Sequence, residues 1–261
     1  MNGAMDSVSA FGPITFVMAF VGPALTLILI GFLWFCPRRF RMPAVLPGIP
    51  LALTSIALQV LVGTFGILRA FQEIATQRRA GVRNVAGSIA AVTGSFALAI
   101  ALSIGCIAAL VIFQVICDRR NEQTEWSEPE DKLAPRIVFF LTAISALATM
   151  ALLWFFGRTV DLILVIVDPM RTAEAQQRLG HLGIGEVAAV ISHRLILCEV
   201  LSLGLAALFL AAPFSLLAGE APEWVRGQSW TLAILTAVCL IPFGITFHQE
   251  ILYMISLIHP R

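Results

Sequence analysis

Six long apolar runs constrain this chain more than any other feature. A helix that crosses a bilayer needs about 20 mostly apolar residues, because hydrocarbon holds no water to satisfy bare backbone groups. The runs of sufficient length are Ile14–Phe35, Ile49–Phe71, Gly87–Cys117, Ile137–Val167, Leu195–Leu217 and Trp230–Ile258. They predict an all-α, polytopic transmembrane bundle of about six membrane helices. We take residues 1–261 as a single transmembrane domain.

The charge content supports a membrane protein. Charged residues make up 13% of the chain and hydrophobic residues 59%, whereas a soluble domain has roughly 25% and about 45–50%. So few charges cannot cover a water-facing surface, and the excess apolar surface is expected to face lipid or other helices. The net charge is +1, which gives no reason to expect a nucleic-acid partner. The lipid bilayer is therefore the first expected partner.

Polar segments mark the connections between the runs. Residues 118–136 contain several glutamates and are interpreted as an acidic extramembrane linker between the third and fourth runs. The stretch Val160–Val167, which follows Arg158, could form a separate interfacial segment. The first basic residue is Arg38, so a cleaved signal peptide is not expected. The 17 basic residues divide almost evenly between the two sets of connections, so they predict no orientation.

Two neighbouring segments carry a family resemblance. Residues 61–75 read LVGTFGILRAFQEIA, and residues 85–89 open the third run with VAGSI. Together they resemble the MotA/TolQ/ExbB proton-channel family, the A-type subunits of ion-driven stator and energy-transducing complexes. The resemblance is limited to about residues 55–112. One residue is missing before Gly66 relative to the family spacing, and Ala91 stands where many members carry Glu.

The resemblance implies a function and a setting. The chain would be a membrane subunit of a proton-driven motor-like or energy-transducing complex in the bacterial inner (plasma) membrane. Several copies would form a homo-oligomer around a small single-helix partner that carries an intramembrane Asp. Hydroxyl groups would line the ion pathway, and the matching positions are Thr64, Ser95 and Thr93. A hydroxyl suits this role because it can both donate and accept a hydrogen bond.

Small residues recur every four positions in the third run, and residues four apart share one helix face. One stripe comprises Gly87, Ala91, Ser95, Ala99 and Ser103, and a second comprises Ala97, Ala101, Gly105 and Ala109. In lipid, small residues let helix backbones approach closely, and this supplies the packing energy. Two stripes predict a helix that is surrounded on two sides, as in an oligomer. Ordinary packing within one six-helix bundle is the alternative.

Glu199 lies inside the fifth run, where an ionisable group normally faces protein or water and marks a pathway or a partner. It is therefore an ion-pathway candidate. A structural pair with Arg194 or His193 is the alternative role. A small self-contained transporter that uses Glu199 is one alternative function, and His248 with Glu250 forms a weaker case of the same kind.

Other classes of function have no sequence support. The five cysteines form no C-x-x-C pair and have no nearby histidine cluster, so free thiols are expected and no metal site. No nucleophile elbow or phosphate loop is present, so neither enzymatic chemistry nor a cofactor is expected. A non-conducting structural or assembly subunit of a larger membrane complex is a further alternative. Residues 152–157 echo residues 61–66, which leaves a divergent internal repeat open.

Overall fold

The structure, a computed structural model, describes residues 13–35, 42–77, 82–121, 133–167, 184–218 and 221–258. The helices in order are α2 (Val21–Phe35), α3 (Val45–Gln77), α4 (Val82–Asn121), α5 (Leu133–Val167), α7 (Ile184–Ala211), the short 3₁₀ helix η1 (Ala212–Ala218) and α8 (Glu223–Ile258). No strand occurs in these ranges. The prediction of an all-α bundle is therefore confirmed.

Six helices of the described chain are long and apolar enough to cross a bilayer. They cover Pro13–Phe35, Val45–Leu68, Val92–Arg119, Leu133–Ile163, Val190–Leu217 and Glu223–Gln249. Each overlaps one run of the sequence analysis, so the chain has the architecture of a multi-pass membrane protein. Helix α5 continues to Val167 without a break, so Val160–Val167 is not a separate segment.

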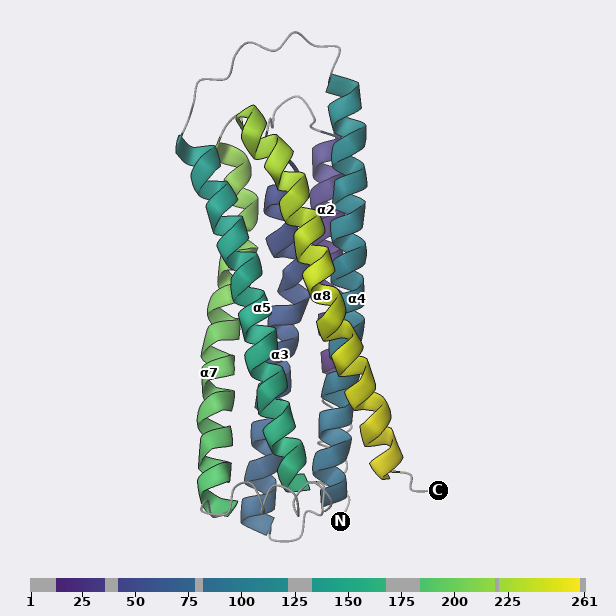
Figure 1. The fold of residues 1–261 in the computed structure, drawn as a ribbon, viewed down its shortest axis with the longest axis vertical. Helices are drawn as coiled ribbons and strands as arrows, with labels where there is room; N and C mark the ends of the chain where they lie inside the picture. The colour runs from purple at the N-terminus through teal and green to yellow at the C-terminus, as the bar shows by residue number, and fades with distance from the viewer. Residues whose placement is uncertain are drawn as a thin grey trace.

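The helices alternate in direction along the bundle (Figure 1). Helix α2 ends, and α3 begins, at the end that is uppermost in Figure 1; we call it the upper end. Helix α4 also ends at the upper end, where α5 and α8 begin. The end of α3, the end of α5 and the beginning of α7 lie at the opposite, lower end. The end of α4 and the beginning of α5, which flank the predicted acidic linker, therefore lie at the same end of the bundle as the end of α2 and the beginning of α3.

Helix α3 is the central element, because it packs against α2, α4, α5, α7 and η1. Every residue from Met42 to Ala57 is buried. A helix that is apolar on all sides is expected to lie inside a bundle in this way. The outer helices instead expose many large apolar side chains, such as Leu27, Leu147 and Leu203. Such exposure is expected where the helices face lipid.

Two glycines let other helices approach α3 closely. A Cβ added to Gly22 of α2 would lie 2.8 Å from the backbone oxygen of Ala52 and 2.9 Å from Ser55 Oγ. A Cβ added to Gly63 of α3 would lie 2.7 Å from a methyl carbon of Val92 on α4. The backbone oxygen of Ala52 cannot move aside, so Gly22 lets α2 and α3 approach closely. At Gly63 an added Cβ would require the Val92 side chain to shift.

An aromatic cluster joins three helices beside Gly63. The ring centroids of Phe96 on α4 and Phe156 on α5 are 4.9 Å apart, and those of Phe96 and Phe247 on α8 are 5.3 Å apart. All three side chains are buried. Stacked and offset rings at these separations stabilise a packed interior beyond their contact area alone.

Candidate functional site

A row of buried polar side chains follows the contact between α3 and α4. It comprises Ser55, Gln59, Ser95 and Ser103, which we call the polar seam. Ser55 and Gln59 are four residues apart on α3, and Ser95 and Ser103 are eight apart on α4, so each pair lies on one helix face. The small-residue stripe of the sequence analysis therefore brings its hydroxyl groups against α3.

Gln59 links three helices at the lower part of the seam. The Ser95 hydroxyl is 2.9 Å from Gln59 Oε1, to which it donates, and 2.8 Å from the carbonyl oxygen of Val92. The Gln59 amide nitrogen in turn donates to the backbone oxygen of Thr15 in the first span. Both ends of the Gln59 amide are therefore satisfied, as a buried polar group in hydrocarbon requires.

Two serines form the upper part of the seam. Ser55 Oγ and Ser103 Oγ are 3.3 Å apart, and the Ser103 hydroxyl donates to the backbone oxygen of Ala52 over 2.8 Å. The latter bond crosses from α4 to α3. The seam thus holds these two helices together by hydrogen bonds as well as by close packing.

The hydroxyl of Thr64 has a different environment. It is buried, and it lies 2.8 Å from the carbonyl oxygen of Val60 and 2.9 Å from that of Leu61, to which it can donate. Such bonds to the preceding turn are common for threonine inside a helix. Thr93 is also buried, on α4. Thr64, Thr93 and Ser95, the hydroxyl residues that the resemblance implies, therefore all lie inside the bundle. Ser95 donates to Gln59, a residue that the resemblance does not include.

The small residues of α4 divide into a buried and an exposed set. Ala99 and Ser103 are fully buried against the rest of the bundle. Ala101 and Gly105 are exposed. Gly87 and Ala91 belong to α4, but their side-chain surroundings lie outside the described residues. One predicted stripe is thus used inside the bundle, whereas the other faces outward.

The outward set extends along one side of α4, and we call it the α4 face: Ala97, Ala101, Gly105 and Ala108. Ala97 is half-buried and the other three are exposed. A Cβ added to Gly105 would meet no atom within 4 Å, apart from its own helix backbone and chain neighbours. No other described helix therefore covers the middle of this face.

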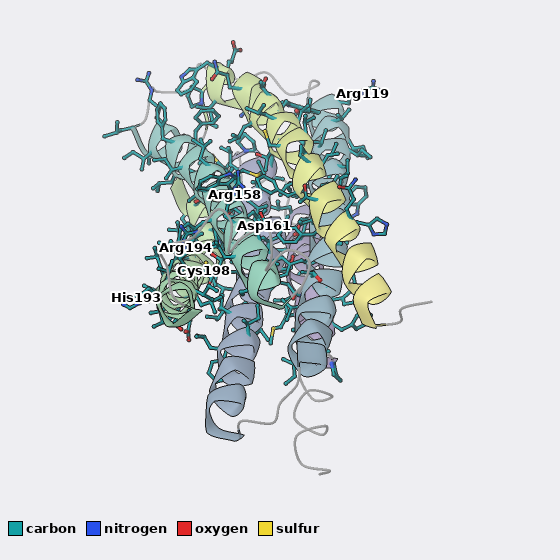
Figure 2. All side chains as sticks on the ribbon, turned by 60° about the horizontal axis from the view of Figure 1, so that its bottom comes forward. Arg119, Arg158, Asp161, His193, Arg194 and Cys198 are labelled. Carbon is teal, nitrogen blue, oxygen red and sulfur yellow. The ribbon has the colours of Figure 1, made fainter. Side chains whose placement is uncertain are left out.

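Charged side chains of α5 and α7 lie in the lower part of their spans. Arg158 and Asp161 form an exposed ion pair of 3.9 Å on α5, and the Arg158 guanidinium lies 5.9 Å from the Trp154 ring centroid. The Arg194 guanidinium of α7 lies 5.6 Å from the ring centroid of Phe155 on α5. Figure 2 shows these arginines along the neighbouring stretches of α5 and α7.

Glu199 is half-buried one residue after the buried Cys198. Its carboxylate forms neither a hydrogen bond nor an ion pair with any residue that the structure describes. The alternative role of Glu199, a structural pair with Arg194 or His193, is therefore not seen in the described part of the chain. The side chain of Glu250, the weaker candidate on α8, lies outside the described residues, and His248 is exposed.

Sequence reasoning missed two buried amides. Gln59 is one, and Gln114 of α4 is the other: its Oε1 accepts a hydrogen bond of 2.7 Å from the backbone nitrogen of Ala44, directly before α3. Gln114 Nε2 donates to Asp118 Oδ1 over 2.8 Å. The sequence did contain a signal: each of these glutamines is an amide within an apolar run. Burial of an amide is costly unless it is hydrogen-bonded, so such a residue is expected to have a partner.

Among the described residues, no three histidine, cysteine, aspartate or glutamate side chains gather in a way that could hold a metal ion. The candidate site comprises the hydrogen-bonded polar seam between α3 and α4 and the exposed α4 face. Comparisons with protein-family models, with curated proteins and with solved structures each return no match.

Proposed function

We propose that this chain is a subunit of an oligomeric membrane complex, and that its copies pack against one another through the α4 face. The observation that carries the proposal is the exposure of Ala101, Gly105 and Ala108 on one side of a membrane-spanning helix. Lipid gives helices no hydrophobic reason to associate, so contacts depend on close packing of small residues. A row without bulky side chains offers that contact.

The spacing favours a second copy of the chain as the occupant. Ala97, Ala101 and Gly105 follow one another at intervals of four residues. This small-xxx-small pattern is typical of pairs of transmembrane helices that cross at short distance. Two copies related by rotation about the membrane normal would place these residues at equal depth. Their α4 helices could then meet without a clash of large side chains.

A second candidate function adds proton coupling. The resemblance to the MotA/TolQ/ExbB family suggests it. One observation supports it: Gln59 and Ser95 of the polar seam, and Thr64 on α3, are all buried inside the same bundle. In this proposal the complex is energy-transducing, its location is the bacterial inner membrane, and a single-helix partner supplies the titratable Asp.

Thr64→Val tests the proton-coupling proposal, because the variant removes a hydroxyl without changing the side-chain volume appreciably. Proton flux in vesicles should fall while the thermal stability stays unchanged. Unchanged flux would contradict proton coupling, and only the proposed assembly role would then remain.

The assembly proposal is tested with Ala101→Leu. A leucine there should prevent close approach of two α4 helices and reduce the oligomer to monomers, as overpacking at an interface costs about 1–3 kcal/mol per site. The measurement is the native mass of the purified protein in lipid nanodiscs. The matched control is Ala151→Leu, at an exposed alanine of α5, which should leave the mass unchanged. A monomeric wild-type protein, or an oligomer that is unaffected by Ala101→Leu, would contradict the proposal.

A further inference from the structure

Two arginines of α5 mark the two headgroup levels of the bilayer. The guanidinium carbon of Arg136 lies 5.8 Å from the ring centroid of Trp224, and that of Arg158 lies 5.9 Å from the ring centroid of Trp154. Residues 137–157 carry no charge, and at 1.5 Å per residue they extend over roughly 30 Å, the thickness of the hydrocarbon core. Arginine and tryptophan side chains are typical of the headgroup level. Arg158 therefore lies at the lower headgroup level.

Arg194 brings a second guanidinium group from α7 to this level. Its guanidinium carbon lies 5.6 Å from the ring centroid of Phe155, and Phe155 precedes Arg158 by three residues on α5. Three residues of an α-helix correspond to a rise of about 4.5 Å and a net rotation of about 60°. Helices α5 and α7 pack against each other. Arg158 and Arg194 therefore both lie at the lower part of the boundary between these helices (Figure 2).

Both guanidinium groups retain hydrogen-bond donors. Arg158 pairs with Asp161 over 3.9 Å, which is longer than a hydrogen bond. Asp161 lies about 120° around α5 from Phe155, so it is turned away from the side that meets Arg194. Arg194 forms no hydrogen bond or ion pair within the part of the chain that the structure describes. Glu199, further along α7, is rotated by about 140° from Arg194. The boundary therefore offers donors to an anion.

Two exposed apolar strips lead from these arginines into the bilayer. Helix α5 ends at the lower end of the bundle and α7 begins there (Figure 1), so residues before Arg158 and residues after Arg194 lie progressively deeper. Each strip continues the helix face of its arginine at intervals of three or four residues. The exposed side chains are Trp154, Ala151 and Leu147 on α5, and Leu197 and Leu201 on α7. A molecule that matches both features has an anionic head and hydrocarbon chains.

We propose that the lower part of the boundary between α5 and α7 binds one anionic phospholipid, with its phosphate at Arg158 and Arg194 and its acyl chains along the two apolar strips. We call this the α5–α7 lipid site. The planar guanidinium group matches the oxygens of a phosphate with two parallel hydrogen bonds. Basic side chains between transmembrane helices are typical of sites for anionic headgroups. The site does not include the α4 face, so it does not depend on the proposed assembly.

The test is native mass spectrometry of the full-length protein, titrated with phosphatidylglycerol or with phosphatidylcholine that has the same acyl chains. We expect the protein to retain phosphatidylglycerol, which has a net negative charge, in preference to phosphatidylcholine. Arg158→Gln and Arg194→Gln should each lower this retention by roughly fivefold, because each removes one positive charge next to the headgroup. The matched control is Arg119→Gln, at an exposed arginine of α4 near the upper end, which should leave the retention unchanged.

Two further variants separate a specific site from a loss of folding. Asp161→Asn removes the carboxylate beside Arg158 and should raise the retention of phosphatidylglycerol, a gain that a misfolded variant would not show. Arg158→Lys keeps the charge but not the planar fork, so its retention should lie between those of the wild-type protein and Arg158→Gln.

An arm with inorganic phosphate distinguishes a lipid from a free anion. Phosphate alone should displace the lipid no better than sodium chloride at the same ionic strength, since it offers nothing to the apolar strips. Stronger displacement by phosphate would show that the site takes a free anion, and this would overturn the assignment to a lipid. Equal retention of the two lipids, equal losses in Arg158→Gln and Arg119→Gln, or a loss in Asp161→Asn would each overturn the inference as well.

Discussion

The hydroxyl of Ser95 on α4 donates a hydrogen bond of 2.9 Å to the side-chain oxygen of Gln59 on α3. Gln59 then donates from its amide nitrogen to the backbone oxygen of Thr15. Three membrane-spanning helices are thus joined through a single amide side chain. Hydrocarbon cannot replace a lost hydrogen bond as water would. Each bond in this hydrogen-bond network therefore depends on the other side chains staying in place.

The first prediction concerns this chain of bonds. Ser95→Ala should lower the free energy of unfolding by about 1 kcal/mol, since the loss leaves a buried amide oxygen without its donor. Gln59→Leu removes the amide itself, so Ser95→Ala should cost less in that background. A double-mutant cycle in detergent micelles measures the difference. Strictly additive effects would show that the two side chains do not interact.

The second prediction separates Thr64 from Ser95. Thr64 can donate to two carbonyl oxygens of its own helix, and these oxygens already serve the helical hydrogen bonds. Thr64→Val should therefore change the unfolding free energy by less than about 0.5 kcal/mol. The same unfolding assay applies. A loss as large as that of Ser95→Ala would mean that Thr64 holds a second helix.

The third prediction concerns the contact between α2 and α3. In Gly22→Ala the new Cβ would meet the backbone oxygen of Ala52 at 2.8 Å, and backbone atoms cannot rotate away. The variant should lose about 1–3 kcal/mol of stability. Gly31→Ala, on the same helix α2, is the matched control, since its Cβ would meet no atom within 4 Å beyond the local backbone. Equal stability of both variants would contradict the close approach of α2 and α3.

The fourth prediction concerns the aromatic cluster. Phe247→Ala would open a cavity beside Phe96 and Phe156, and the described helices α4, α5 and α8 would each lose packing there. We expect a loss of roughly 2–4 kcal/mol. Phe140→Ala, at an exposed ring of α5, should cost less than about 0.5 kcal/mol. Thermal unfolding of both variants provides the comparison, and a stable Phe247→Ala variant would show that the cluster is dispensable.

The sequence predicted the helices well because membrane spans depend on length and apolar content alone. It also identified α4 as a helix with two small-residue stripes. What it could not decide was which stripe faces inward: Ala99 and Ala101 have the same side chain, yet one is fully buried and the other is exposed. That outcome depends on which helices pack beside α4, and the order of the runs does not contain this information.

The pairing of polar groups was harder still to predict. Gln59 is a single amide in an apolar run. The helical period of 3.6 residues predicts the helix face on which it lies, but not the residue that it contacts. Glu199 and Arg194 are close in sequence, but five residues on a helix rotate them onto different flanks. Only the packing of α7 against α3 and α5 shows that Arg194 lies over Phe155. The resemblance to a channel family predicts a role for Thr64, whereas the hydrogen bonds of the structure also involve Gln59.

Disulfide formation at the α4 face tests the assembly proposal most directly. The native cysteines are replaced, single cysteines are introduced by Ala101→Cys or Gly105→Cys, and native membranes are oxidised mildly. Two copies that pack through this face bring equal positions within the roughly 7 Å between Cα atoms that a disulfide allows. We predict crosslinked dimers for both variants and none for Ala99→Cys, which is buried inside the bundle, or Ala151→Cys on α5. Dimers at Ala151→Cys but not at Ala101→Cys or Gly105→Cys would contradict assembly through α4.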